Sequence, residues 1–161
     1  MGPRISERVK LPELGAGGAQ LAPPELELRQ IVCATNLDSN ALAVASDAVR
    51  LAEEFQARLT LLHVMEDYAK LGNRPGPIDD SLQRLQNLVP SDAALAYVPE
   101  VLLEYGSVAS TILKVAADRE ADLLVLGAHA AADMLRSTHL PWSTAHQVIV
   151  QAHCPVLTIR G

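Results

Sequence analysis

Two short apolar runs in the C-terminal part of the chain constrain its fold most. They read Ala-Asp-Leu-Leu-Val-Leu-Gly at 121–127 and Cys-Pro-Val-Leu-Thr-Ile-Arg at 154–160, with a helix-like segment between them. A continuous Leu/Val run of this length is too short for a membrane span and is typical of a strand covered on both faces, as in parallel sheets with crossover helices. Because ligands of such sheets bind beyond the carboxyl ends of the strands, the segment after Gly127 is the first place to look for function.

Charge and aromatic content argue against nucleic-acid binding. The chain has 161 residues, 19 Asp and Glu against 13 Lys and Arg, a formal net charge of -6 and only 3% aromatic residues. It therefore has neither the basic surface that phosphate backbones require nor many rings on which bases could stack. Its length indicates one domain with a substantial core. Small molecules or proteins are the expected partners.

The same sequence predicts a cytoplasmic protein without membrane contact. No apolar stretch reaches the roughly 18 residues of a membrane span, and the N-terminal residues do not form the apolar region of a signal peptide. Cys33 and Cys154 lie inside strand-like apolar runs. They are interpreted as small buried hydrophobic residues in a reducing compartment rather than as a disulfide or a catalytic thiol.

Strand-like and helix-like segments alternate after residue 29. Residues 1–29 have no sustained periodicity and are interpreted as a flexible arm, and 30–161 as one domain. The expected strands are Gln30–Thr35, Arg58–Val64, Tyr97–Glu104, Asp122–Leu126 and Val156–Arg160. This βαβ order predicts a doubly wound α/β fold.

Four helices are expected between these strands. The first follows a polar turn at 36–40 that can cap it, the second begins near Asp79 after a loop over 66–77, the third follows a cap at Ser107, and the fourth has Pro141 in its first turn and runs through Ala152. The apolar residues of the first two recur every three or four positions; they are Leu42, Ala45, Ala48, Val49, Ala52 and Phe55, then Ile78, Leu82, Leu85 and Val89.

Five segments together resemble the universal stress protein family over about residues 28–161. They are Ile31-Val-Cys-Ala-Thr35, Leu61-Leu-His-Val64, Tyr105-Gly106 ahead of a helix, Asp122-Leu-Leu-Val-Leu-Gly127 and Cys154-Pro-Val-Leu-Thr-Ile-Arg160. The resemblance implies a five-stranded parallel sheet in the order 3-2-1-4-5 with helices on both faces. It also implies that any ligand cleft lies where strands one and four part.

Members of this family that bind ATP resemble one another after strand one and after strand two. Strand one here ends at Thr35, and Asn36 stands where those members have an acidic residue beside the adenosine. Asn36 retains hydrogen-bonding capacity but has no charge. Val64, after His63, matches the position where backbone groups meet the base. His63 itself is interpreted as a satisfied, half-buried histidine.

The phosphate-binding loop departs further from the ATP-binding pattern. Gly127 matches its first glycine, Ala130 replaces the second, and Trp142 stands at the third, followed by the hydroxyl residues Ser143 and Thr144. Glycine suits these positions because phosphate oxygens approach backbone N–H groups at a helix N-terminus, where a β-carbon crowds them. Trp142, the only tryptophan of the chain, is interpreted as filling a gap over the sheet edge. The sharper hypothesis is that its indole occupies space that a triphosphate would use.

The resemblance therefore predicts a non-catalytic regulatory or stress-response module with weakened or absent ATP binding and no expected cofactor. It also implies a homodimer paired through Val156, Leu157, Thr158 and Ile159 of the last strand, whose edge is otherwise exposed. An unidentified protein partner is expected. The alternative is a switch in which ATP or AMP binds and alters the dimer surface.

Three other sites have weaker support in the sequence. The residues His129, Asp133, His139, His146 and His153 lie in one region, but they lack the close spacing of a zinc motif such as His-Glu-x-x-His or paired Cys-x-x-Cys. Ser143 has no Gly-x-Ser-x-Gly elbow around it, as a hydrolase of the α/β class would have. The segment 35–39 lacks the glycine or histidine signatures of adenylylating enzymes. No metal site and no catalytic residue are predicted.

Overall fold

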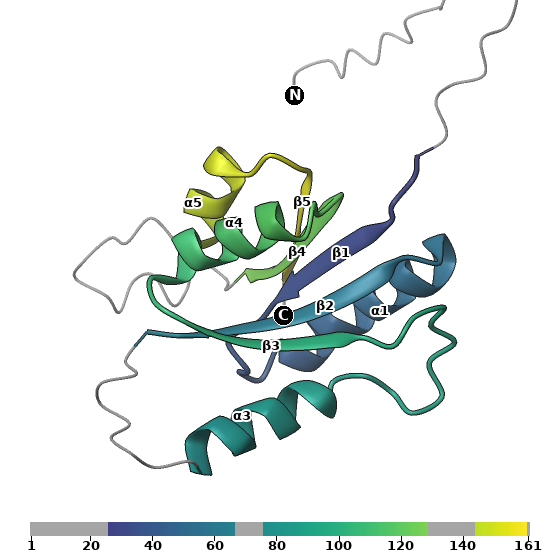
Figure 1. The fold of residues 1–161 in the computed structure, drawn as a ribbon, viewed down its shortest axis with the longest axis horizontal. Coiled ribbons are helices and arrows are strands. Elements are labelled where there is room, and N and C mark those ends of the chain that lie inside the picture. The colour runs from purple at the N-terminus through teal and green to yellow at the C-terminus, as the bar shows by residue number, and fades with distance from the viewer. Residues whose placement is uncertain (1–25, 67–75, 129–143, 161) are drawn as a thin grey trace, which may run out of the picture.

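A computed structural model describes residues 26–66, 76–128 and 144–160. Their strands form one five-stranded parallel sheet in the order β3-β2-β1-β4-β5. The strands are β1 (Gln30–Ala34), β2 (Arg58–Met65), β3 (Glu100–Tyr105), β4 (Leu123–Ala128) and β5 (Val156–Arg160). Figure 1 shows β1 in the middle of the sheet, between β2 and β4. The predicted fold class and strand order are confirmed.

Four helices cover the two faces of the sheet. They are α1 (Ala41–Phe55), α3 (Gly76–Gln86), α4 (Val108–Asp118) and α5 (Thr144–Gln151). Helices α1 and α3 lie on one face, and α4 and α5 lie on the other (Figure 1). No helix in the described residues is long and apolar enough to cross a membrane.

Each face of the sheet has its own hydrophobic core. The core under α1 and α3 contains Cys33, Leu61 and Leu85, each with 0% of its surface exposed. The core under α4 and α5 contains Leu124 and Val148, also at 0%. Alternate residues of each inner strand point to opposite faces, so both faces need apolar side chains. This explains the continuous apolar runs of β1, β2 and β4.

The start of the sheet is fixed by residues that precede β1. Leu28, placed in the arm by the sequence analysis, is 8% exposed and belongs to the core under α1. The backbone N–H groups of Arg29 and Gln30 both donate to Oδ2 of Asp122, at 2.8 and 2.9 Å. Asp122, which precedes β4, thus holds the first residue of β1 and the residue before it.

The predicted apolar stripe of α1 is wrong at its first position. Leu42 is 58% exposed, and Val44, which the prediction left out, is 1% exposed. A residue advances about 100° around a helix, so Ala41, Val44 and Ala45 face the sheet while Leu42 lies on the flank. The cap positions are right, since Asn40 and Ser107 precede α1 and α4, but neither side chain makes a capping hydrogen bond in the described structure.

Other predicted boundaries also moved. Helix α3 begins at Gly76 rather than near Asp79, and it ends before Val89, which packs on the core from the following turn. Pro77 lies in the first turn of this helix, where backbone N–H groups have no acceptor within the helix, so its lack of an N–H is tolerated. Pro141, the predicted start of the last helix, lies outside the described residues.

Strand β3 starts later than the sequence predicted. Tyr97 stacks on the guanidinium of Arg58, with 5.0 Å from the cation to the ring centroid, and Val98 is 94% exposed. The apolar side chains of Tyr97 and Val98 led to the prediction of a strand here, but the chain pairs with β2 only from Glu100 onward. Gly106, which directly follows β3, has a φ of +132°, and its N–H donates to the Met65 carbonyl. A side chain is disfavoured in that conformation.

Both cysteines are free thiols in the structure. Cys33 is fully buried in β1, and burial raises the pKa of its thiol to about 12. Cys154 is partly buried, and burial again raises its thiol pKa. Since the thiolate is the reactive form, neither environment activates the sulfur. The interpretation of the two cysteines as buried hydrophobic residues holds for Cys33 and in part for Cys154.

We therefore expect Cys33 to resist thiol reagents in the native protein. A chromogenic disulfide reagent at pH 7.5 should label Cys154 slowly and should reach Cys33 only after urea unfolds the chain. A Cys33→Ala variant is the control, and its native labelling should equal that of the parent protein. Rapid native labelling of Cys33, located by peptide mass spectrometry, would contradict this expectation.

Candidate functional site

The carboxyl edge of the sheet gathers most of the predicted site residues that the structure describes. Thr35 directly follows β1, Val64 is near the end of β2, and Gly127 is near the end of β4. Since β1 lies between β2 and β4, these three positions lie at one edge, with α1, which follows β1, on one face of the sheet and α5, which follows β4, on the other. That is the switch point at which doubly wound proteins bind ligands.

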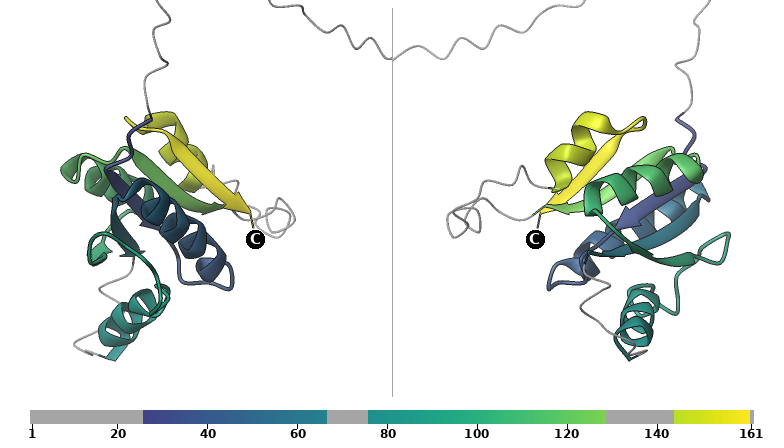
Figure 2. Two further views of the ribbon diagram at one scale, coloured as in Figure 1. Left: turned by 90° about the vertical axis from the view of Figure 1, so that its right-hand side faces the viewer. Right: turned by 60° about the vertical axis from the view of Figure 1, so that its left-hand side comes forward.

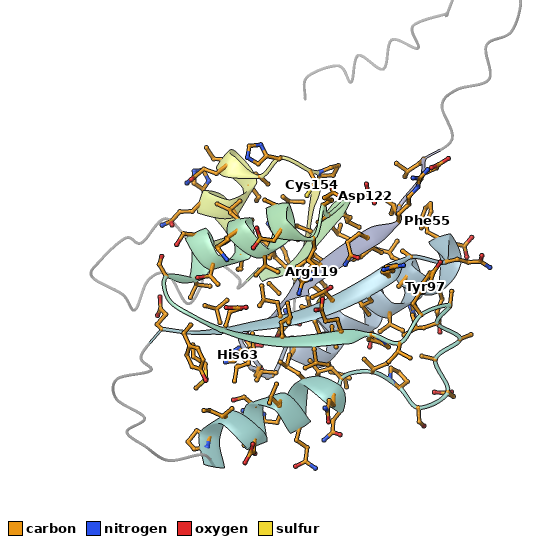
Figure 3. All side chains as sticks on the ribbon, viewed as in Figure 1. Phe55, His63, Tyr97, Arg119, Asp122 and Cys154 are labelled. Atoms are coloured by element: carbon orange, nitrogen blue, oxygen red, sulfur yellow. The ribbon has the colours of Figure 1, made fainter. Side chains whose placement is uncertain are left out.

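Thr35 is held by several hydrogen bonds. Its N–H donates to the Leu62 carbonyl at 2.9 Å, and its Oγ1 accepts from the Leu37 N–H at 3.1 Å. Its carbonyl accepts from Nδ1 of His63 at 2.8 Å. A carbonyl oxygen only accepts, so Nδ1 is the protonated ring nitrogen. His63 is half-buried and satisfied, as predicted, and Figure 3 shows it toward the end of β2.

The residues after Thr35 form a compact turn that we call the switch-point loop, residues 35–40. Asn36 is exposed, and its Oδ1 accepts from the Asp38 N–H at 3.4 Å. Asp38 Oδ1 accepts in turn from the Asn40 N–H at 2.8 Å. Asn36 thus presents an uncharged amide at the position where the family resemblance implies an acidic residue for ATP binding.

The phosphate side of the predicted site is described only at its two ends. Thr144 is the first residue of α5 and is exposed. Ala130, Trp142 and Ser143 lie outside the described residues. Val148 of α5 packs in the same core as Val64, so α5 covers the face of the sheet to which Val64 points.

Gly127 has a packing role that the sequence analysis did not foresee. A β-carbon built at this position would lie 3.3 Å from Cγ2 of Val44 and 3.8 Å from Nδ2 of Asn40. The first distance is tighter than normal van der Waals contact. The absence of a side chain therefore lets the start of α1 lie close against β4, whether or not a ligand binds nearby.

Replacing Gly127 with alanine should destabilise the protein by about 1 kcal/mol or more, because overpacked cores lose about 1–3 kcal/mol. Truncating Val44 to alanine removes the crowding methyl group, so the second substitution should cost less in the Gly127→Ala background than alone. Urea unfolding of the four proteins measures this coupling. Strictly additive effects, or a neutral Gly127→Ala, would contradict the packing role.

A second group of polar side chains lies at the opposite, amino edge of the sheet. Arg119 donates from two nitrogens to the two carboxylate oxygens of Glu100, at 2.8 and 2.6 Å. Thr60 donates to the same carboxylate at 3.0 Å and accepts from Gln30 at 3.0 Å. The hydrogen bond from Arg119 is the main reason that the pKa of Glu100 is lowered. All four groups satisfy one another, which indicates a structural role.

Two further candidates do not coincide with the carboxyl edge. A pocket of about 190 Å³ lies between the end of α4 and the segment before β5, lined by residues that include Leu113, Ala116 and Cys154. Among the described residues no three His, Cys, Asp or Glu side chains cluster as metal ligands. Of the residues weighed for zinc, His129, Asp133 and His139 lie outside the described part.

Sheet order and switch-point geometry define a small doubly wound α/β protein of the type that places a ligand between strands one and four. Comparison with known proteins then identifies the family. The sequence profile of the universal stress protein family matches residues 27–160. The chain belongs to the universal stress protein family.

Individual relatives agree with this assignment. A curated universal stress protein of Methanocaldococcus jannaschii is 28% identical over 144 residues, which cover 82% of this chain and 82% of that protein. The solved structure of the universal stress protein UspA from Lactobacillus plantarum superposes with a TM-score of 0.62 at 28% identity, covering 84% of this chain and 100% of the other.

More distant structures share the fold. A universal stress protein solved in complex with cAMP has a TM-score of 0.63 at 18% identity, covering 84% of this chain and 98% of the other. A universal stress protein from Archaeoglobus fulgidus solved in complex with dAMP has a TM-score of 0.52 at 14% identity, covering 84% and 99%. At these identities the likeness concerns the fold alone.

Proposed function

We propose that this protein acts as a homodimeric regulatory module of the universal stress type, which works through protein contacts and has a weakened nucleotide site. The observation that carries the proposal is the exposed apolar surface around β5. Leu157 is 37% exposed, and Ile149 and Val150 on the neighbouring α5 are 50% and 67% exposed. Leu157 shares the α1 face of the sheet with Ile159, whereas α5 lies on the other face, so exposed apolar side chains occur on both faces next to the open edge, as is typical of an interaction surface.

The open edge of β5 also has unused backbone groups. The Leu124 N–H donates to the Pro155 carbonyl, and Leu124 is in register with Val156. In a parallel ladder alternate residues point their backbone groups toward one neighbour. Val156, Thr158 and Arg160 therefore point theirs away from β4. In Figure 2 β5 forms the outer strand of the sheet, next to α5.

A second copy of the chain is the simplest partner for this edge. An antiparallel pairing of two β5 strands around a two-fold axis joins the outward groups of one copy to those of the other and extends the sheet. The pairing through Val156, Leu157, Thr158 and Ile159 remains our proposal. Sedimentation equilibrium of the full chain at micromolar concentration tests it: we expect a dimer, and a stable monomer would overturn the proposal.

A nucleotide-responsive switch is the second candidate. It is supported by the convergence of Thr35, Val64 and Gly127 at the switch point and by two proteins of the same fold that were solved with cAMP and dAMP. Against tight ATP binding stands the uncharged Asn36. The free thiols Cys33 and Cys154 fit a reducing cytoplasm in either case.

Calorimetric titration with ATP and with AMP separates the two candidates. A dissociation constant near 1 μM corresponds to about 8 kcal/mol of binding free energy, which a weakened site should not reach. We expect ATP to bind at least about 100-fold more weakly than that. Binding of ATP at 1 μM or tighter, or mass-spectrometric detection of nucleotide carried through purification, would establish the switch instead.

A further inference from the structure

The switch-point loop contains a residue in an unusual backbone conformation. Leu37 has a φ of 59°, in the left-handed region that residues other than Gly, Asn and Asp rarely adopt, and it is only 6% exposed. Such a conformation carries an intrinsic free-energy cost and persists only where the surroundings hold it. In the switch-point loop this residue is Leu37, directly after Asn36, so its surroundings must stabilise the backbone there.

Two side chains from other elements hold the loop from one side. His63 of β2 donates to the Thr35 carbonyl at 2.8 Å, and the guanidinium of Arg84, in the last turn of α3, donates to the Leu37 carbonyl. Thr35 and Leu37 flank Asn36 in the sequence. The backbone on both sides of Asn36 is therefore fixed by contacts that come from outside the loop.

The position of Arg84 depends in turn on the anchoring of α3. Leu85, the next residue, has 0% of its surface exposed and packs in the core under α1 and α3. Because Leu85 fixes the register of this helix on the sheet, a shift of α3 would move the guanidinium away from the Leu37 carbonyl. Helix α3 is thus connected to the switch-point loop through the hydrogen bond from Arg84 to the Leu37 carbonyl.

We propose that Arg84 is a positioning residue, through which α3 sets the shape of the switch-point loop and hence the affinity of the site beside Asn36 for an adenine nucleotide. The inference rests on the second candidate function, in which this site binds nucleotide. An uncharged amide on a fixed backbone suits the hydroxyl groups and ring nitrogens of a nucleoside, which donate and accept hydrogen bonds without charge.

Hydrogen exchange of the Leu37 amide, measured by NMR on the full chain, tests the positioning. Arg84→Met keeps most of the apolar stem but removes the donors, and it should speed exchange of the Leu37 amide at least tenfold relative to Val32 and Leu61 in the sheet. Arg84→Lys, which retains a donor, should restore part of the protection. Arg50→Met, at an exposed arginine of α1, is the matched control and should leave the loop unchanged.

Titration of the same proteins with AMP tests the consequence for binding. If the parent protein binds AMP, Arg84→Met should raise the dissociation constant for AMP at least tenfold. Arg84→Lys should raise it less, and Arg50→Met should leave it unchanged. Unchanged Leu37 exchange, an equal rise throughout the sheet, or unchanged AMP affinity in Arg84→Met would overturn the inference. A parent protein that binds no AMP would refute the nucleotide switch and the effect on affinity, while the exchange data would still decide whether Arg84 holds the loop.

Discussion

A proline at position 158 should separate the two copies of the proposed dimer while each copy stays folded. Thr158 lies on β5 with its backbone N–H directed away from β4, as the register with Leu126 and the Leu124–Pro155 hydrogen bond require. Proline removes that donor without removing a hydrogen bond to β4, and edge strands accept proline where the N–H faces outward. The substitution therefore acts on the dimer and spares the sheet.

The expected loss is large because a two-fold axis repeats the change. Each of two outward hydrogen bonds left unmade costs about 1–3 kcal/mol. The dissociation constant of the dimer should therefore rise about 30-fold or more. Sedimentation equilibrium measures the dissociation constant, and circular dichroism shows whether the monomer is folded. Thr158→Ala keeps the N–H and should leave the dimer intact.

Proline at the neighbouring position 157 should act on the sheet instead of the dimer. Leu157 points its backbone groups toward β4, so Leu157→Pro should disrupt the sheet itself and lower the midpoint of urea unfolding. If Thr158→Pro leaves a dimer of unchanged affinity, pairing through the open edge of β5 is refuted. The exposed Ile149 and Val150 of α5 would then be the place to look for another interface.

Truncation of Leu61 to alanine should cause a large loss of stability, because Leu61 is one of the largest fully buried side chains of the described residues. Leu61 has 0% of its surface exposed, lies on β2 in register with both Cys33 and Val101, and packs under α1 and α3. Leucine-to-alanine changes in such positions cost about 2–5 kcal/mol, from lost burial and from the cavity left behind. That is a large part of the stability of an ordinary domain.

Urea unfolding followed by circular dichroism measures the change, with the midpoint falling while the slope stays constant. Val98→Ala is the matched control, because Val98 is 94% exposed and an exposed change of this kind stays within about 0.5 kcal/mol. A loss below 1 kcal/mol for Leu61→Ala would mean that the region under α1 and α3 is not a tightly packed core.

Strand boundaries were predictable from the sequence at some strands and not at others. Strand β5 was predicted to the residue and β4 to within two residues. For β4 the reason is that a strand buried on both faces needs apolar side chains throughout and so leaves an unbroken run. Strand β5 has a similar run, although it is an edge strand in which no residue is fully buried. The start of β3 was not predicted, because Tyr97 and Val98 are apolar for reasons other than pairing: Tyr97 stacks on Arg58, and Val98 is exposed.

The candidate site was predictable only in outline. The order of the segments placed Thr35, Val64 and Gly127 at strand ends, and the parallel sheet then brings them to one edge. Nothing local in the sequence marks Leu37 as left-handed, since leucine has no preference for that conformation. Its φ is 59°, and its carbonyl accepts a hydrogen bond from Arg84, which lies 47 positions further along the chain.

By itself the sequence determined which segments are strands and helices, the α/β class, the acidic charge and, through the order of its motifs, the family. The segments, the class and the charge depend on periodicity and composition, which are local, and the family was inferred from the resemblance of five motifs in their order. Only the tertiary structure decided that Gly127 makes room for Val44, that Leu157 remains exposed at the edge, and that Arg84 reaches the loop after β1. Each of these depends on the distance between residues far apart in sequence, which packing of the whole fold sets.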